Sequence, residues 1–115
     1  MITFEDFSKV MSFNLEHKCC IEIEFYVKGN DAFMECWMGK SPDKSTRKDL
    51  YWFGLTPDGE NVFDYPTFQE LSTAKVFGGK SLLEIWDSIE FISIDGCDPM
   101  ERVRFYAGEK LCSES

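Results

Sequence analysis

The chain has 115 residues, of which 21 are acidic and 12 basic, so its formal net charge is −9. Its aromatic content of 16% excludes a disordered chain, because so many rings need a hydrophobic core. The acid excess disfavours nucleic acid and anionic membranes as partners, since both bind basic surfaces. A chain of this length indicates one domain, which we predict over residues 1–108, with a frayed tail over residues 109–115.

The N-terminus and the cysteines indicate a cytoplasmic protein. The N-terminal residues lack the basic and apolar regions of a signal peptide, and no run of about 18 apolar residues offers a membrane span. Five cysteines at irregular spacing fit reduced thiols better than a disulfide framework.

The first predicted element is a helix. Thr3 and Asp6 have the spacing of a capping box, in which Asp takes the place of Glu. Apolar residues then recur at helical spacing up to residues 12–14: Phe4, Phe7, Val10 and Met11.

A β-hairpin is predicted next. Apolar and polar residues alternate over Cys19–Lys28, as in a half-buried antiparallel strand. The turn residues Gly29-Asn30-Asp31 follow, and the alternation resumes over Ala32–Gly39. Ser41–Asp49 has no apolar side chain and is predicted to be a solvated loop.

Two further strands and two short helices are predicted in the middle of the chain. The strands cover Leu50–Leu55 and Asn61–Tyr65, with a turn built on Pro and Gly over Thr56–Glu60. Gly78-Gly79 separates the two helices, each of which begins with a capping-box pair. The pairs are Thr67 with Glu70 and Ser81 with Glu84.

The C-terminal part is predicted to return to the sheet. Glu90–Ile94 reads as a β-branched strand, and Arg102–Ala107 alternates polar and apolar residues as a last strand. The predicted order is α-β-β-β-β-α-α-β-β. This order indicates an α+β fold with a mostly antiparallel sheet of five to six strands, an N-terminal helix and two short helices between strands 4 and 5.

Two patterns resemble catalytic or metal motifs but are incomplete. Gly78–Ser81 ends like a phosphate-binding P-loop, yet Ala74 stands where the first glycine of that motif is needed, so a helix cap explains the segment. His17 with Cys19 and Cys20 could begin a zinc site, but further ligands at ordinary spacing are missing. No catalytic residue, cofactor or metal is therefore predicted.

Six residues are predicted to bind a partner or ligand. If helices cover only one face of the sheet, some aromatic rings stay exposed on the other and mark a recognition surface; the alternative is a curved sheet that buries them all. The aromatic candidates are Trp37, Tyr51, Trp52 and Phe53. Asp95 and Asp98 place two carboxylates in a turn, where a cation or substrate could bind, although Asp-Gly is also an ordinary turn signal.

The last third of the chain resembles small uncharacterised bacterial proteins of unknown function. The resemblance lies in Tyr65–Leu71, Val76–Leu82 and Ile92–Gly96. It implies a bacterial cytoplasmic origin and no activity.

Three functions compete. The leading hypothesis is a non-enzymatic, acidic protein-binding module, immunity- or antitoxin-like, that meets a basic partner through its aromatic sheet face and acidic C-terminal half. The alternative is a small-molecule-binding or enzymatic domain, with a cavity between sheet and helices lined by Trp37, Trp52 and Trp86 and with Asp95 or Asp98 as the polar group. The third is a structural subunit of a homo-oligomer.

Overall fold

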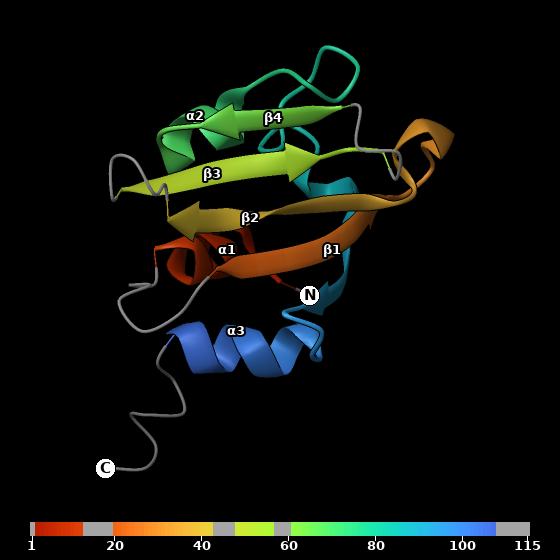
Figure 1. Ribbon diagram of the computed structural model, residues 1–115. Helices are drawn as coiled ribbons and strands as arrows, with labels where there is room; N and C mark the ends of the chain where they lie inside the picture. The colour runs from red at the N-terminus through yellow and green to blue at the C-terminus, as the bar shows by residue number, and fades with distance from the viewer. Residues whose placement is uncertain (1, 13–19, 43–47, 57–60, 108–115) are drawn as a thin grey trace, which may run out of the picture.

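The computed structural model describes residues 2–12, 20–42, 48–56 and 61–107. Five strands form one antiparallel sheet in the order β4-β3-β2-β1-β5 (Figure 1). The strands are β1 (Ile21–Val27), β2 (Cys36–Pro42), β3 (Asp49–Gly54), β4 (Val62–Tyr65) and β5 (Ile89–Ile94). The helices are α1 (Phe4–Met11), α2 (Phe68–Thr73) and α3 (Pro99–Ala107), with 3₁₀ turns η1 (Asp31–Phe33) and η2 (Trp86–Ser88). The predicted α+β class with a mostly antiparallel sheet is confirmed.

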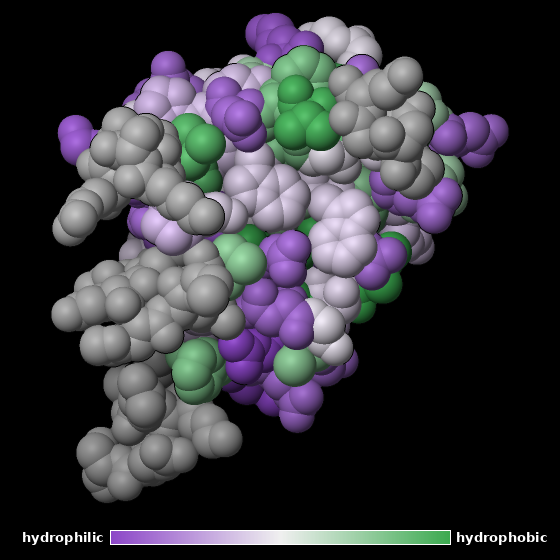
Figure 2. Space-filling view, viewed as in Figure 1, coloured by the Kyte–Doolittle hydropathy of each residue, from purple (hydrophilic) through white to green (hydrophobic). Residues whose placement is uncertain are grey.

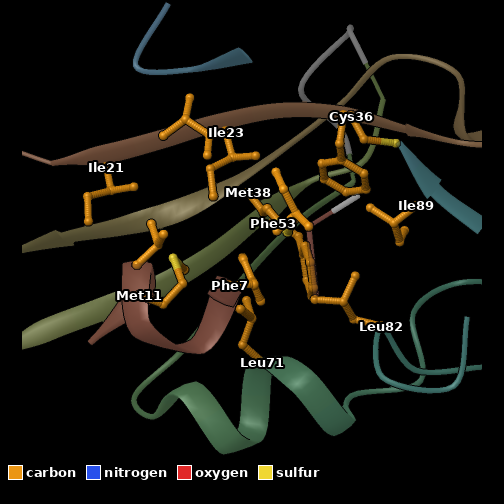
Figure 3. Packing of buried hydrophobic residues seen from close by; sticks show 14 of the residues in the cluster. Phe7, Met11, Ile21, Ile23, Cys36, Met38, Phe53, Leu71, Leu82 and Ile89 are labelled. Carbon is orange, nitrogen blue, oxygen red and sulfur yellow. The ribbon is translucent and has the colours of Figure 1, made fainter. Parts of the chain in front are cut away.

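Helix α1 begins with the predicted capping box. Thr3 Oγ1 accepts a hydrogen bond from the Asp6 backbone N–H at 3.0 Å, and the Thr3 backbone N–H donates to Asp6 Oδ2 at 3.4 Å. In Figure 3, Phe7 and Met11 of α1 and Leu71 of α2 point toward the strands. Helices α1 and α2 therefore cover the same face of the sheet. The hydrophobic core lies between these helices and the sheet.

Strand β1 has the predicted alternation of buried and accessible side chains. Its buried residues are Ile21, Ile23, Phe25 and Val27. The intervening residues are exposed or half-buried on the opposite face: Glu22, Glu24 and Tyr26. One face of β1 thus contributes to the core, and the other is polar.

Strand β2 starts four residues later than the predicted start at Ala32. The reason is local, because Asn30 Oδ1 accepts a hydrogen bond from the Ala32 backbone N–H at 3.0 Å and caps the 3₁₀ turn η1. Part of the predicted solvated loop belongs to the sheet, since β2 ends at Pro42 and β3 begins at Asp49. Residues 43–47 of that loop and residues 57–60 of the predicted turn lie outside the described residues.

The second predicted short helix is only a turn followed by η2. Its capping box does form: the Ser81 backbone N–H donates to Glu84 Oε1 at 2.9 Å, and the Glu84 backbone N–H donates to Ser81 Oγ at 3.2 Å. One helical hydrogen bond follows, from Ile85 N to Ser81 O at 3.2 Å. Strand β5 begins at Ile89, directly after η2.

The predicted last strand is wrong, because that segment forms helix α3. Asp98 Oδ2 accepts a hydrogen bond from the Glu101 backbone N–H at 3.2 Å, and Pro99 occupies the first helical position, where it needs no hydrogen-bond partner. Val103 and Tyr106 are buried three residues apart, at helical spacing. In a segment this short, the apolar residues fit both the alternation of a strand and the spacing of a helix. The Asp98 cap favours the helix.

Candidate binding surface

The sheet has one covered face and one open face. Figure 1 looks onto the open face: α1 and α2 lie behind the sheet and α3 lies beyond β1, so none of the described helices covers the front. Figure 2 shows the same side, with pale, near-neutral side chains gathered over β2 and β3 and hydrophilic ones over β1. We call this side the open sheet face.

Strand register divides the predicted aromatic candidates between the two faces. Met38 pairs with Phe53 and Lys40 with Tyr51 on the covered face, where Phe53 is fully buried and Tyr51 half-buried against α2. Burial, followed by the Asp49 charge, raises the pKa of Tyr51. Phe53 is therefore part of the hydrophobic core, and Tyr51 packs against that core on the covered face.

Trp52 lies on the open sheet face, over a glycine of the neighbouring strand. Its cross-strand partner is Gly39, where a Cβ atom would meet the Trp52 Cζ2 atom at 2.9 Å and the Ile21 carbonyl oxygen at 1.9 Å. Trp52 Nε1 donates a hydrogen bond to Ser41 Oγ at 3.1 Å. The missing side chain and this hydrogen bond hold the indole down on β2.

Trp37 lies on the same face and is 40% exposed. It also pairs with a glycine, Gly54, where a Cβ would lie in ordinary contact with Trp37 Cβ at 3.9 Å. The two Trp-x-Gly segments thus pair with each other, each tryptophan opposite the other's glycine. Sequence reasoning missed this arrangement, although the repeated Trp-x-Gly spacing is visible in the sequence.

Carboxylates border the two indoles. Glu24 of β1 lies directly opposite Trp37, Asp64 of β4 lies directly opposite Trp52, and Glu22 lies opposite Gly39. None of these three carboxylates forms an ion pair with another described residue. The open sheet face therefore combines two indoles with three carboxylates that form no ion pair within the described part of the chain.

Cations are absent from this face within the described strands. Their only basic residue is Lys40, which points to the covered face and pairs with Asp49, Nζ to Oδ2, at 3.1 Å. Lys28 follows β1 and pairs with Glu90 at 3.9 Å. Glu22, Glu24 and Asp64 thus have no basic neighbour within the described strands of this face.

The predicted Asp95 belongs to a structural clamp between β1 and α3. Its backbone N–H donates to the Glu22 carbonyl oxygen at 2.7 Å, and Asp95 Oδ1 accepts from the Glu22 backbone N–H at 3.0 Å. Its other oxygen, Oδ2, accepts from the Tyr106 hydroxyl at 2.5 Å and from Arg102 Nη2 at 3.4 Å. Burial opposes the charge of Arg102, but the Tyr106 hydrogen bond and the Asp95 carboxylate raise the pKa of its guanidinium overall.

The predicted Asp98 caps α3 and is exposed. The structure thus brings Trp37 and Trp52 together on one face and places Asp95 and Asp98 at the start of α3. Both acids have hydrogen bonds to the protein itself, which explains their presence in the turn.

The three tryptophans do not line one cavity. Trp86 lies on the covered side, where its ring packs against Phe4, Phe7 and Phe91 and its Nε1 donates to the Ile2 carbonyl oxygen at 3.2 Å. Trp37 and Trp52 are on the opposite face of the sheet.

A shallow groove of about 500 Å³ lies instead at the free edge of β5. Its lining residues are Ile2, Lys28, Ile89, Glu90, Phe91, Pro99 and Met100. The two charged groups in it, Lys28 and Glu90, already pair with each other.

The segment that resembles a P-loop is a tight hairpin turn. Phe77 and Lys80 exchange backbone hydrogen bonds at 3.0 and 3.3 Å, and both central glycines have positive φ, of 63° and 89°. Such a two-residue turn needs glycine and leaves the amides of Phe77 and Lys80 engaged. His17 and Cys19 lie outside the described residues.

Comparisons with known proteins return no relative. The chain matches no family model, no curated protein and no solved structure. Among the described helices, none has the length and apolar character needed to cross a membrane.

Proposed function

We propose that this protein is a non-enzymatic binding module that recognises a basic protein partner through the open sheet face. The supporting observation is the combination of two indoles with carboxylates that form no ion pair to any described residue, on a face that the described helices leave uncovered. Tryptophan supplies a large contact area at a low entropic cost, and unpaired acids favour a partner of opposite charge. A nuclease toxin has such a basic surface, and the carboxylates would take the place of its phosphate ligands, as in an immunity protein.

Face-specific capture tests the proposal. Immobilised wild-type protein and the variants Trp37→Ala and Glu24→Gln are compared in a lysate of the source cells, at about 50 mM and about 500 mM salt, which spans weak to strong screening. We expect a partner that the wild-type protein retains at low salt, that high salt weakens and that both variants lose.

The controls carry a comparable apolar truncation and the same removal of a carboxylate charge elsewhere on the surface. Leu83→Ala removes an exposed apolar side chain after the Gly-Gly turn, and Glu5→Gln removes an exposed charge on α1. A partner that the open-face variants and the controls retain equally, or no partner at either ionic strength, contradicts the proposal.

A further inference from the structure

We infer that the basic partner presents arginine, whose guanidinium group stacks on Trp37 and donates hydrogen bonds to Glu24. This inference rests on the proposed function and specifies the chemistry of the partner. It makes Trp37 and Glu24 the central contact of the open sheet face.

The pairing of β1 with β2 places the two side chains together. Trp37 and Glu24 are directly opposite in the antiparallel register and point to the same face. Side chains at such positions have Cβ atoms about 4.5–5.5 Å apart. A cation over the indole is therefore within hydrogen-bond reach of the carboxylate.

The Trp37 indole and the Glu24 carboxylate are both accessible to a partner. Trp37 is 40% exposed, and Glu24 is half-buried with no ion pair to another described residue. A half-buried carboxylate has lost part of its hydration, so a cation that reaches it gains more than at a fully solvated site. Gly54, opposite Trp37 on the other side, adds no side chain to shield the indole.

Arginine fits this geometry better than lysine. A guanidinium group is planar and weakly hydrated, so it can stack on an indole while its edge N–H groups point to a carboxylate. The lysine ammonium is compact and strongly hydrated, and it gains less from the ring.

A second indole and carboxylate extend the site. Trp52 and Asp64 are directly opposite on β3 and β4, and Trp52 is diagonal to Trp37 across β2 and β3. Diagonal neighbours in a sheet are about 7–8 Å apart. A partner segment with two arginines can therefore place one guanidinium on each indole.

Two other ligand classes that stack on aromatic rings fit less well. Single-stranded RNA also stacks on sheet-face aromatics, but its phosphates would be repelled by Glu22, Glu24 and Asp64. Quaternary ammonium groups are bound in aromatic cages that surround the cation, whereas Trp37 and Trp52 lie side by side on one face of the sheet.

Two peptides of equal charge test the inference. The capped pentapeptide Gly-Arg-Gly-Arg-Gly and its lysine counterpart are titrated into the full chain, and amide and indole chemical shifts are followed by NMR. We expect the arginine peptide to bind about tenfold more tightly, which corresponds to a cation–π gain at a partly desolvated site. The shifts should centre on Trp37, Glu24 and Trp52.

Substitutions separate stacking from charge. Trp37→Leu keeps apolar volume but removes the ring, so it should reduce arginine binding to the level of lysine. Glu24→Gln should weaken both peptides and keep the arginine preference, while Leu83→Ala should change neither affinity. Dispersed amide spectra verify that each variant is folded.

The outcomes distinguish this inference from the proposed function. Equal binding of the two peptides on the open sheet face, or an arginine preference that survives Trp37→Leu, overturns the arginine inference and leaves the binding module in place. Binding of an oligouridylate to the open sheet face overturns the inference as well. If neither peptide binds and the open-face variants capture the partner as well as the wild-type protein does, both the arginine inference and the proposed function are wrong.

Discussion

At the residue scale, Lys40 is a charged side chain inside the core. It is 1% exposed and pairs with Asp49, whose side chain is 34% exposed. We expect Asp49→Asn to lower the free energy of unfolding by about 2 kcal/mol, less than a fully buried pair loses, because water still reaches one partner.

Replacing the lysine itself should cost less. Lys40→Met removes the charge and keeps the length, so its effect should stay within about 1 kcal/mol. Urea unfolding of both variants measures the difference. A larger loss for Lys40→Met than for Asp49→Asn would contradict the argument that a buried lysine charge without the Asp49 carboxylate is the costly state.

Gly39 and Gly54 provide a matched pair on the open sheet face. A Cβ at Gly39 would lie 1.9 Å from the Ile21 carbonyl oxygen, so Gly39→Ala must displace β1 or β2. We expect a loss of at least about 2 kcal/mol, as for an overpacked core, and a change in the tryptophan emission, to which Trp52 contributes. Gly54→Ala, whose Cβ meets its nearest neighbour at 3.9 Å, should change stability by less than about 1 kcal/mol. Equal losses in the two variants would be inconsistent with this contact.

The buried thiol of Cys36 should make the free energy of unfolding fall at alkaline pH. Burial raises the pKa of its thiol from 9.0 to about 11, so the unfolded chain ionises first and stability falls as pH rises through this window. Between about pH 8 and about pH 10.5, the wild-type protein should lose about 2 kcal/mol more than Cys36→Ala. Urea midpoints at the two pH values measure the difference, and parallel pH profiles would refute it.

At the element scale, α3 is held to the sheet by the clamp of Asp95, Arg102 and Tyr106. The Tyr106 hydroxyl donates to Asp95 Oδ2 in a setting where the tyrosine is only 5% exposed. Tyr106→Phe should cost about 1.5–3 kcal/mol, the range for a hydrogen bond to a charged group. Hydrogen exchange should accelerate in α3 first, while the amides of β2 keep their protection. Uniform acceleration over the whole sheet would argue against a local clamp.

The elements differ in how far the sequence predicts them. The capping box of Thr3 with Asp6 and the alternation in β1 are strong local signals, and both predictions are confirmed. In each element, the spacing of the apolar residues alone sets which side is buried. The segment 102–107 was predicted as a strand because Val103 and Phe105 alternate with polar residues. The segment forms a helix because Asp98 caps its first turn and because Val103 and Tyr106, three residues apart, are both buried in the core. An alternation over five or six residues predicts neither the cap nor these tertiary contacts.

At the whole-molecule scale, the open sheet face should keep two copies of the protein apart. Face-to-face stacking would bring Glu22, Glu24 and Asp64 of one copy against the same acids of another, and like charges across an interface cost several kcal/mol. We therefore expect a monomer by light scattering at low salt. A dimer at low salt that Trp37→Ala disrupts would show that this face pairs with itself.

The sequence by itself determined the α+β class, the start of α1, the buried side of β1 and the excess of acid, because these depend on local periodicity, capping residues and composition. It also contained the two Trp-x-Gly segments. Only the tertiary structure decided that Trp37 lies opposite Gly54 and Glu24, that Trp52 rests on Gly39, and that Phe53 is buried while Trp37 is exposed and Trp52 half-buried. Strand order and register pair residues that are distant in the chain, and local signals do not specify which strands become neighbours.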